Sequence, residues 1–274
     1  MRLLCALGLF LALLHVTSCL LIGAFNNQCF GDRKSQDNVV MNIIKEIVLR
    51  YDIILIQEVR CNHNLSVPNR LLALVNEGSP QFKGIVSEPL PLGSTISHRE
   101  RYLFLYRYQK VSVTDSFQYT DTVFSRPPSV VKFSSTQTVG KEFVLISIHT
   151  QPTNAVVELR ALVDVVKRAE TKWLNKNIMV LGDFNAGSNY VPMYTRPTIP
   201  LFNTTVFQWL IANNVDTTVS RSGNAYDRIV VTTDMYNGMN PRSADKFDFK
   251  NAYGLTQAQT EAVSDHFPVE VQIL

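Results

Sequence analysis

Short apolar runs recur along the whole chain, and their lengths suit strands more than helices. Eight of them lie at residues 20–25, 51–59, 101–107, 130–135, 142–149, 177–184, 226–232 and 267–274. The last run, FPVEVQIL, alternates apolar and polar residues, which is the period of a half-buried strand. Other runs are apolar nearly throughout, so the chain must bury sheets rather than only helices.

Helical periodicity interrupts this series of strands in two clear places. The apolar positions of the first are Val40, Ile43, Ile44, Ile47 and Val48, and those of the second are Ala155, Leu159, Leu162, Val163 and Val166. Asn154 is the expected N-cap of the second helix, and FQWLI at residues 207–211 is a shorter helix candidate. Strands spread evenly among a few helices predict one α/β domain of two packed sheets with helices outside.

The first residues have the composition of a leader rather than of a folded domain. MRLLCALGLFLALLHVTSC has one Arg, a Leu-rich run and then small residues, so residues 1–19 are predicted to be a secretory signal peptide. The domain would then occupy residues 20–274 of a soluble, secreted protein, because no later apolar stretch approaches the ~20 residues of a membrane span. Sequons at Asn64 and Asn203 fit an extracellular glycoprotein.

The charge balance and the common motifs narrow the function only by exclusion. Lys and Arg together number 26, and Asp and Glu 23, for a formal net charge of +3. Such a mild excess permits a nucleic-acid ligand but does not indicate one. The sequence has no Gly-x-Ser-x-Gly elbow, P-loop or dinucleotide fingerprint, which disfavours acyl hydrolases, NTPases and Rossmann enzymes.

Polar and ionisable side chains lie where the predicted strands begin or end. They are Asn26, Glu58, Glu100, His149, Asp183, Asn185, Asp227, Asp265 and His266. Each has an ordinary explanation alone, such as an Asx-turn or a solvent-facing carboxylate. Together they are more informative, because the loops at one end of a sheet sandwich cluster and build sites there.

The residue types in this set agree with one chemistry. Hard oxygen donors, which suit Mg²⁺ or Ca²⁺, are offered by Asn26, Glu58, Asp183 and Asp265. Two histidines have possible carboxylate partners, His149 with Glu100 and His266 with Asp227, and suit general acid and base work. A hard metal ion with paired histidines predicts hydrolysis of a phosphodiester.

Six segments carry a family resemblance: LIGAFNNQCFG, YDIILIQEVR, RERYLFLYR, LGDFNAGSNYV, NAYDRIVV and VSDHFPVEVQIL. In the same order, from about residue 20 to the last residue, they closely resemble the secreted deoxyribonuclease I family. The resemblance implies an α/β fold, a four-layered sandwich of two central mixed β-sheets flanked by helices. It also implies a monomeric endonuclease that cleaves double-stranded DNA with little sequence specificity, leaves 5′-phosphate ends and requires Mg²⁺ or Ca²⁺, with Mn²⁺ as a substitute.

The resemblance assigns a role to each matching position. The implied catalytic residues are Glu100, His149, Asp227 and His266, and the implied metal ligands are Asn26, Glu58, Asp183 and Asp265. The implied substrate contacts are Arg60, Arg126, Asn185 and Tyr226. A structural calcium site would use Asp216, Thr218, Ser220 and Ser222, whereas a second family calcium site is doubtful because the loop at residues 119–121 is short.

The chain also departs from the family pattern. Ser188 and Asn224 stand where the family usually has two cysteines, so lower stability is expected. His98 replaces a tyrosine that packs into the minor groove, and Gly84 replaces an aromatic residue of the actin-binding segment, so weak or absent actin binding is expected. The missing cysteines and His98 support an alternative hypothesis, a catalytically weakened paralogue that binds DNA or actin.

Two cysteines of the predicted domain occupy equivalent places in the sequence. Cys29 lies three residues past Asn26, and Cys61 lies three residues past Glu58. If Asn26 and Glu58 meet on neighbouring parallel strands, the two sulfurs come within reach of a disulfide. Two free thiols are the alternative that the spacing leaves open, and an oxidising compartment favours the bridge.

Overall fold

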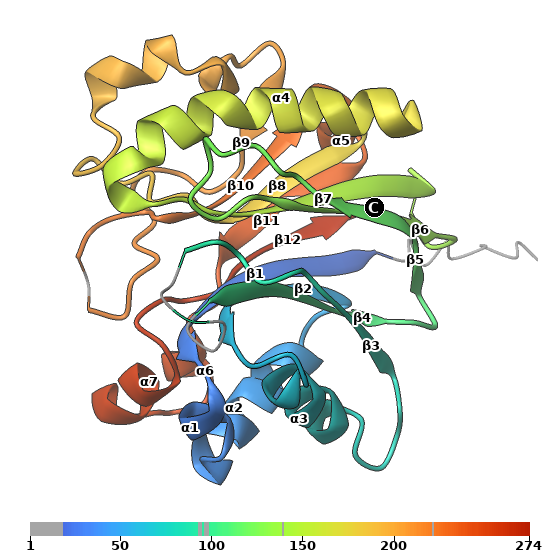
Figure 1. Cartoon of the computed structure of the whole chain (residues 1–274), viewed down its shortest axis with the longest axis vertical. Coiled ribbons are helices and arrows are strands. Elements are labelled where there is room, and N and C mark those ends of the chain that lie inside the picture. The colour runs from blue at the N-terminus through green and yellow to red at the C-terminus, as the bar shows by residue number, and fades with distance from the viewer. Residues whose placement is uncertain (1–18, 93–94, 96–98, 139, 221) are drawn as a thin grey trace, which may run out of the picture.

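The computed structural model describes residues 19–92, 95, 99–138, 140–220 and 222–274. Two six-stranded β-sheets lie face to face at its centre, and helices cover both outer faces (Figure 1). This arrangement confirms the predicted four-layered α/β sandwich with two mixed sheets. The signal peptide predicted for residues 1–19 lies, apart from Cys19, outside the described residues.

The two sheets have the strand orders β11-β12-β1-β2-β4-β3 and β5-β6-β7-β8-β10-β9. The first consists of β1 (Leu20–Phe30), β2 (Ile53–Arg60), β3 (Phe82–Val86), β4 (Glu100–Arg107), β11 (Met239–Lys246) and β12 (Val269–Ile273). The second consists of β5 (Val111–Gln118), β6 (Ser129–Ser135), β7 (Glu142–His149), β8 (Ile178–Asp183), β9 (Phe207–Trp209) and β10 (Asp227–Thr232). Among these strands, β1 pairs with β2 in parallel and β7 pairs with β8 in parallel.

Helices form the two outer layers (Figure 1). Those beside the first sheet are α1 (Asp32–Ser35), α2 (Asn38–Leu49), α3 (Ser66–Val75), α6 (Phe249–Ala252) and α7 (Gln257–Val263). The second sheet is crossed by α4 (Ala155–Trp173), accompanied by α5 (Thr233–Tyr236) and the 3₁₀ turns η2 (Pro152–Asn154), η3 (Met193–Thr198) and η4 (Pro200–Phe202). None of the described helices has the length and apolar composition that crossing a membrane requires.

The space between the sheets is filled by apolar side chains from both of them. Ile22 and Leu55 from the first sheet are fully buried in one cluster with Leu145 and Leu181 from the second. Full burial of one such side chain contributes roughly 1.5–3 kcal/mol. The apolar runs of the sequence thus stabilise the face-to-face packing of the sheets.

The two predicted amphipathic helices are present as α2 and α4. The Asp37 carboxylate accepts hydrogen bonds from Val39 N and Val40 N and so caps the start of α2. Asn154 precedes α4 as expected, but its side chain makes no cap hydrogen bond. The turn η2 runs directly into α4, and the Asn154 amide instead donates to Glu158 Oε1.

The helix predicted at residues 207–211 is wrong, because Phe207–Trp209 forms β9, antiparallel to β10. Phe207 is buried in the outer-layer cluster of the second sheet. The ring of Trp209 stacks on that of Phe202, with centroids 4.1 Å apart. These tertiary contacts, rather than local propensity, decide the conformation here.

A buried amide joins the two sheets. Gln57 of β2 donates from Nε2 to Ile148 O (2.7 Å), and its Oε1 accepts from Asp183 N (3.0 Å). Gln57 lies so close to β8 that a Cβ on Gly182 would lie 2.8 Å from Gln57 Nε2, and Gly182 has a φ of +131° that favours glycine. Gln57 therefore fixes how the strand ends of the two sheets meet.

Strand β1 buries another amide that lacks such partners. Asn27 is 0% exposed, and within the described part of the chain neither its Oδ1 nor its Nδ2 has a hydrogen-bond partner. A buried polar group left unsatisfied costs about 1–3 kcal/mol. Asn27 therefore lowers the stability of the layer that it occupies.

We predict opposite effects for the same substitution at these two amides. Asn27→Leu is nearly isosteric and should raise the free energy of unfolding by ~1 kcal/mol, because it removes an unsatisfied group. Gln57→Leu should lower it by about 1–3 kcal/mol, since Ile148 O and Asp183 N lose their partner. Urea denaturation measures both changes, and a destabilised Asn27→Leu protein would contradict the prediction.

Candidate active site

The carboxyl ends of the two parallel strand pairs meet at one end of the sandwich. Asn26 and Glu58 lie toward the ends of β1 and β2, and His149 and Asp183 end β7 and β8. The Asn26 amide donates to Asp183 Oδ2 across the sheets, at 3.1 Å. Side chains from distant parts of the sequence therefore reach one place, as the sequence predicted.

Glu100, at the start of β4, anchors one imidazole. His149 Nδ1 lies 2.9 Å from Glu100 Oε2, and Arg126 Nε lies 2.8 Å from the same oxygen. Burial alone would raise the pKa of Glu100, but the hydrogen bond from His149 and the Arg126 charge lower it to about 2. Burial alone would lower the pKa of His149, but its partners raise it, led by the hydrogen bond to Glu100. We call His149 with Glu100 the first imidazole pair.

Asp227, at the start of β10, anchors a second imidazole. His266 Nδ1 lies 2.7 Å from Asp227 Oδ2. Burial raises the pKa of Asp227. Burial alone would lower the pKa of His266, but the charge of Asp227 and its hydrogen bond raise it to about 10. We call His266 with Asp227 the second imidazole pair.

Both imidazoles face a single carboxylate oxygen. His149 Nε2 lies 3.6 Å and His266 Nε2 lies 3.9 Å from Asp183 Oδ2. Because Nδ1 of each ring contacts its own carboxylate, Nε2 is the nitrogen that each ring presents to the space beside Asp183. Two oriented imidazoles at one point can accept one proton and donate another.

Carboxylates gather around this point in two groups that could bind a metal ion. Ligand atoms of Glu58, Glu100 and His149 lie within 4.8 Å of one another. Those of Asp183, Asp227 and His266 form a second group within the same limit. Carboxylate oxygens are the ligands that Mg²⁺ and Ca²⁺ prefer, so the donors fit a hard divalent cation.

Of the four residues predicted as metal ligands, one belongs to each group and two lie beside them. Glu58 belongs to the first group and Asp183 to the second. Asn26 contacts Asp183, and Asp265 Oδ1 lies 3.8 Å from His266 Nε2 with its side chain 48% exposed. The structure thus brings all four predicted residues to the site.

Two site residues have a left-handed backbone that is unusual outside glycine. Glu58 has a φ of 59° and Asn185 has a φ of 45°. The Glu58 carboxylate accepts from Cys29 N (2.8 Å), and Asn185 N donates to Asp183 Oδ1 (2.8 Å). Such conformations cost of order 1–3 kcal/mol each and cluster at functional sites.

The predicted substrate contacts border the two imidazole pairs. Arg60 Nη2 lies 3.4 Å from Glu58 Oε2 and 3.7 Å from Glu100 Oε1. The centroid of the Tyr226 ring lies 6.4 Å from the centroid of the His266 ring. Arg126 is buried and its guanidinium pairs with Glu100. Arg60 is therefore the more accessible of the two cations.

Two hydroxyl groups to which the sequence assigned no role also fix the site. Tyr102 Oη accepts a hydrogen bond from His149 N (2.9 Å). Ser264 Oγ donates to Asn26 O (2.6 Å) and accepts from His266 N (3.1 Å). Each hydroxyl lies two residues from a predicted catalytic residue, which is the signal that the sequence offers for it.

Comparison with known proteins decides the family. A model described as the Endonuclease/Exonuclease/phosphatase family matches residues 23–266. Deoxyribonuclease-1 of Equus caballus is 44% identical over 271 residues, which cover 96% of this chain and 95% of that protein. Deoxyribonuclease-1 of Homo sapiens is 42% identical over 282 residues, which cover 100% and 99%. The chain belongs to the deoxyribonuclease I family.

Solved structures share the sandwich of this deoxyribonuclease I family member. The catalytic domain of human Nocturnin has a TM-score of 0.64 at 16% identity and covers 94% of both chains. ANGEL2, a 2′,3′-cyclic phosphatase, has a TM-score of 0.60 at 12% identity and covers 93% of this chain and 94% of that one. At such low identities the likeness shows the fold alone.

The loop predicted to bind structural calcium precedes β10. Asp216 Oδ1 accepts from Thr218 N (3.0 Å) and Thr218 Oγ1 (2.8 Å), and its Oδ2 accepts from Gly223 N (2.9 Å). Thr218 Oγ1 also accepts from Ser222 N (2.9 Å) and lies 3.0 Å from Ser222 Oγ. The structure thus gathers Asp216, Thr218 and Ser222, while Ser220 lies in the same loop outside these contacts.

The disulfide predicted between Cys29 and Cys61 is wrong, because both are free cysteines. Cys29 is exposed and has a left-handed backbone, with a φ of 53°. Cys61 is buried in the apolar cluster that contains Val67 and Leu71. The pairing of β1 with β2 becomes irregular after Asn26, so equal spacing along the two strands does not bring the sulfurs together.

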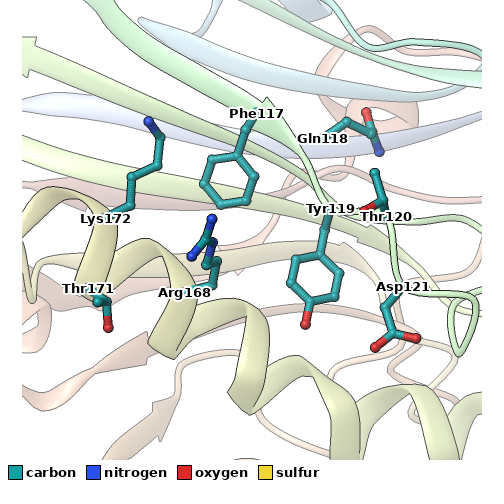
Figure 2. Close-up of a pocket in the computed structure, with 8 residues that line it drawn as sticks. All are labelled: Phe117, Gln118, Tyr119, Thr120, Asp121, Arg168, Thr171 and Lys172. Atoms are coloured by element: carbon teal, nitrogen blue, oxygen red, sulfur yellow. The ribbon is translucent and has the colours of Figure 1, made fainter.

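A cavity of about 890 Å³ lies apart from the site, between the end of β5 and α4 (Figure 2). It is lined by Phe117, Gln118, Tyr119, Thr120, Asp121, Arg168, Thr171 and Lys172. Asp121 is the one carboxylate among these residues, and its Oδ1 accepts from Val123 N. The cavity has neither the imidazoles nor the grouped carboxylates of the strand ends, so the strand ends are the candidate active site.

We predict that the first imidazole pair makes stability depend on pH. The pKa of Glu100 falls from 4.5 to about 2 on folding. The contribution of Glu100 to the free energy of unfolding is therefore present above pH 4.5 and is lost as the pH falls toward about 2. Glu100→Gln should therefore destabilise the metal-free protein at neutral pH, by of order 3 kcal/mol at most. Urea denaturation across the acid range should show this gap narrowing below pH 4.5, whereas a constant gap would contradict the assignment.

Proposed function

We propose that this protein is an endonuclease that hydrolyses phosphodiester bonds of double-stranded DNA with a divalent metal ion. The observation that carries the proposal is the approach of His149 Nε2 and His266 Nε2 to one Asp183 oxygen, at 3.6 and 3.9 Å. The relatives that match almost the whole chain are named Deoxyribonuclease-1, which supports DNA as the substrate.

The oxygen donors of the site support Mg²⁺ or Ca²⁺, with Mn²⁺ as a substitute. The residues that would bind the ion are Asn26, Glu58, Asp183 and Asp265. When bound, the ion offsets negative charge on the phosphoryl oxygens. Grouping Glu58 with Glu100, and Asp183 with Asp227, concentrates negative charge that favours binding of a cation.

The two imidazole pairs supply the proton transfers of hydrolysis. Glu100 and Asp227 each bind Nδ1 of their histidine, which orients Nε2 toward the substrate. One imidazole accepts a proton from the attacking water as its oxygen bonds to phosphorus. The other donates a proton to the leaving 3′ oxygen as the P–O bond breaks, and the product carries a 5′-phosphate.

DNA binding is proposed to rely on the sugar–phosphate backbone. Arg60, Arg126, Asn185 and Tyr226 are the contacts that we assign. Backbone contacts give affinity and salt dependence but little base recognition, which fits cleavage with low sequence specificity. Arg60 is the principal cation for this purpose, because Arg126 is buried against Glu100.

We also propose that the enzyme is a secreted, monomeric glycoprotein. The composition of residues 1–19 supports a cleaved leader, with residues 20–274 as the catalytic domain. Asn64 and Asn203 of the two sequons are exposed, as glycosylation requires.

Nicking of supercoiled plasmid by the purified protein tests the function. We expect cleavage with Mg²⁺ or Mn²⁺ and none with EDTA, and His149→Ala should lower the rate about 10²–10⁴-fold. His63→Ala, which alters an exposed histidine outside both imidazole pairs, is the matched control and should leave the rate unchanged. DNA binding without metal-dependent nicking would instead support the catalytically weakened paralogue.

Actin binding is predicted to be weak or absent. Gly84 lies in β3, an edge strand of the first sheet, where it offers a partner no aromatic side chain. Loss of an aromatic anchor costs ~2 kcal/mol or more at an interface. Monomeric actin should therefore leave DNA cleavage nearly unchanged, and strong inhibition at low actin concentration would refute this prediction.

A further inference from the structure

A buried carboxylate lies behind the first imidazole pair. Glu158 is in the first turn of α4 and is 0% exposed. Its Oε1 accepts from Ser125 N (3.1 Å) and Asn154 Nδ2 (3.4 Å), and its Oε2 accepts from Gln151 N (3.3 Å). Burial raises the pKa of Glu158, and these N–H donors oppose that effect. One side chain therefore ties a loop and a turn to the start of α4.

Both tied segments lead to Arg126. Ser125 is its neighbour in the chain, so the hydrogen bond to Glu158 fixes the backbone that carries Arg126. Gln151 Oε1 accepts from Arg126 Nη1 at 3.3 Å. Tyr102 Oη donates to Arg126 O at 3.2 Å and completes the support.

Arg126 in turn supports the first imidazole pair. Its Nε and Nη2 lie 2.8 and 2.9 Å from the two oxygens of Glu100. The same carboxylate orients His149 through Nδ1. A continuous series of polar contacts thus runs from Glu158 through Arg126 and Glu100 to the imidazole.

We propose that Glu158 is a positioning residue, which places Arg126 against Glu100 and so orients His149. The inference rests on the proposed function, because this orientation affects a rate only if His149 takes part in the chemistry. Glu158 itself contacts none of the reacting groups.

The chemistry of the position favours this role over simple packing. Glu158 shares the buried face of α4 with Ala155 and Leu162, where an apolar residue would fill the space. Burying an ionisable acid costs free energy unless hydrogen bonds compensate it. A carboxylate accepts N–H groups from two segments at once, which leucine cannot do and glutamine does only in part.

Glu158→Gln and a double-mutant cycle with Arg126→Ala test the proposal. In plasmid nicking, Glu158→Gln should lower kcat by about 10- to 100-fold. The NH₂ group of the glutamine cannot accept a hydrogen bond as the second carboxylate oxygen does, so the contacts that orient the His149 imidazole shift. KM should change much less. With Arg126→Ala already present, adding Glu158→Gln should change kcat by less than about twofold, since the two residues act in series.

Glu170→Gln is the matched control, because it makes the same substitution later in α4. It should leave kcat unchanged. If Glu158→Gln is as active as the wild type, the proposal is overturned. It is also overturned if the fold-losses in kcat of Glu158→Gln and Arg126→Ala multiply in the double variant. An inactive wild type would instead refute the proposed function, and the next measurement would still test the contacts.

Amide hydrogen exchange tests the contacts in the unaltered protein. Ser125 and Gln151 lie outside all helices and strands, so ordinary loop amides at these positions would exchange rapidly. If Glu158 accepts their protons, both amides should exchange far more slowly than exposed Thr120. Rapid exchange at either amide would overturn the proposal even if Glu158→Gln failed to fold.

Discussion

The geometry of the site depends on the amide of Gln57, which connects the two sheets where their strand ends meet. It donates to Ile148 O of β7 and accepts from Asp183 N of β8, so it fixes the residues just before His149 and at Asp183. Apolar packing alone allows two sheets to slide, because the hydrophobic effect is not directional. A buried amide that is hydrogen-bonded through both its nitrogen and its oxygen selects one relative position, and Gly182 permits the close approach.

The same strand ends concentrate charge that folding alone does not favour. Glu58 and Glu100 share one group, and Asp183 and Asp227 share another, so like charges lie close together in a buried region. The two histidines and Arg126 offset part of this repulsion. The left-handed backbone at Glu58 adds a further cost. A site that is unfavourable for stability and yet holds its side chains in place by hydrogen bonds is typical of one shaped for binding and catalysis.

The sequence predicted the layers and the site residues because each left a local signal. Continuous or alternating apolar runs marked the central strands, and polar residues at their ends marked the site. Edge strands left no such signal: β11 reads MNPRSADK and is stabilised by pairing with β12. The Cys29–Cys61 prediction failed because the pairing of β1 with β2 becomes irregular after Asn26, which changes the course of the backbone. The spacing of the residues in the sequence gives no sign of this irregularity. Glu158 stood within an ordinary helix pattern, and only the folded structure shows which N–H groups it meets.

The two imidazole pairs are fixed by different means. The first is braced from inside the fold, by Glu158 through Arg126. The second is fixed from the surface, because the loop that begins at Asp216 leads directly into it. Thr217 Oγ1 in that loop accepts from Asp227 N, and Thr218 forms a β-bridge with His266. Whatever orders this loop therefore orders the second imidazole, so a calcium ion bound there would act on the reaction through position and not through chemistry.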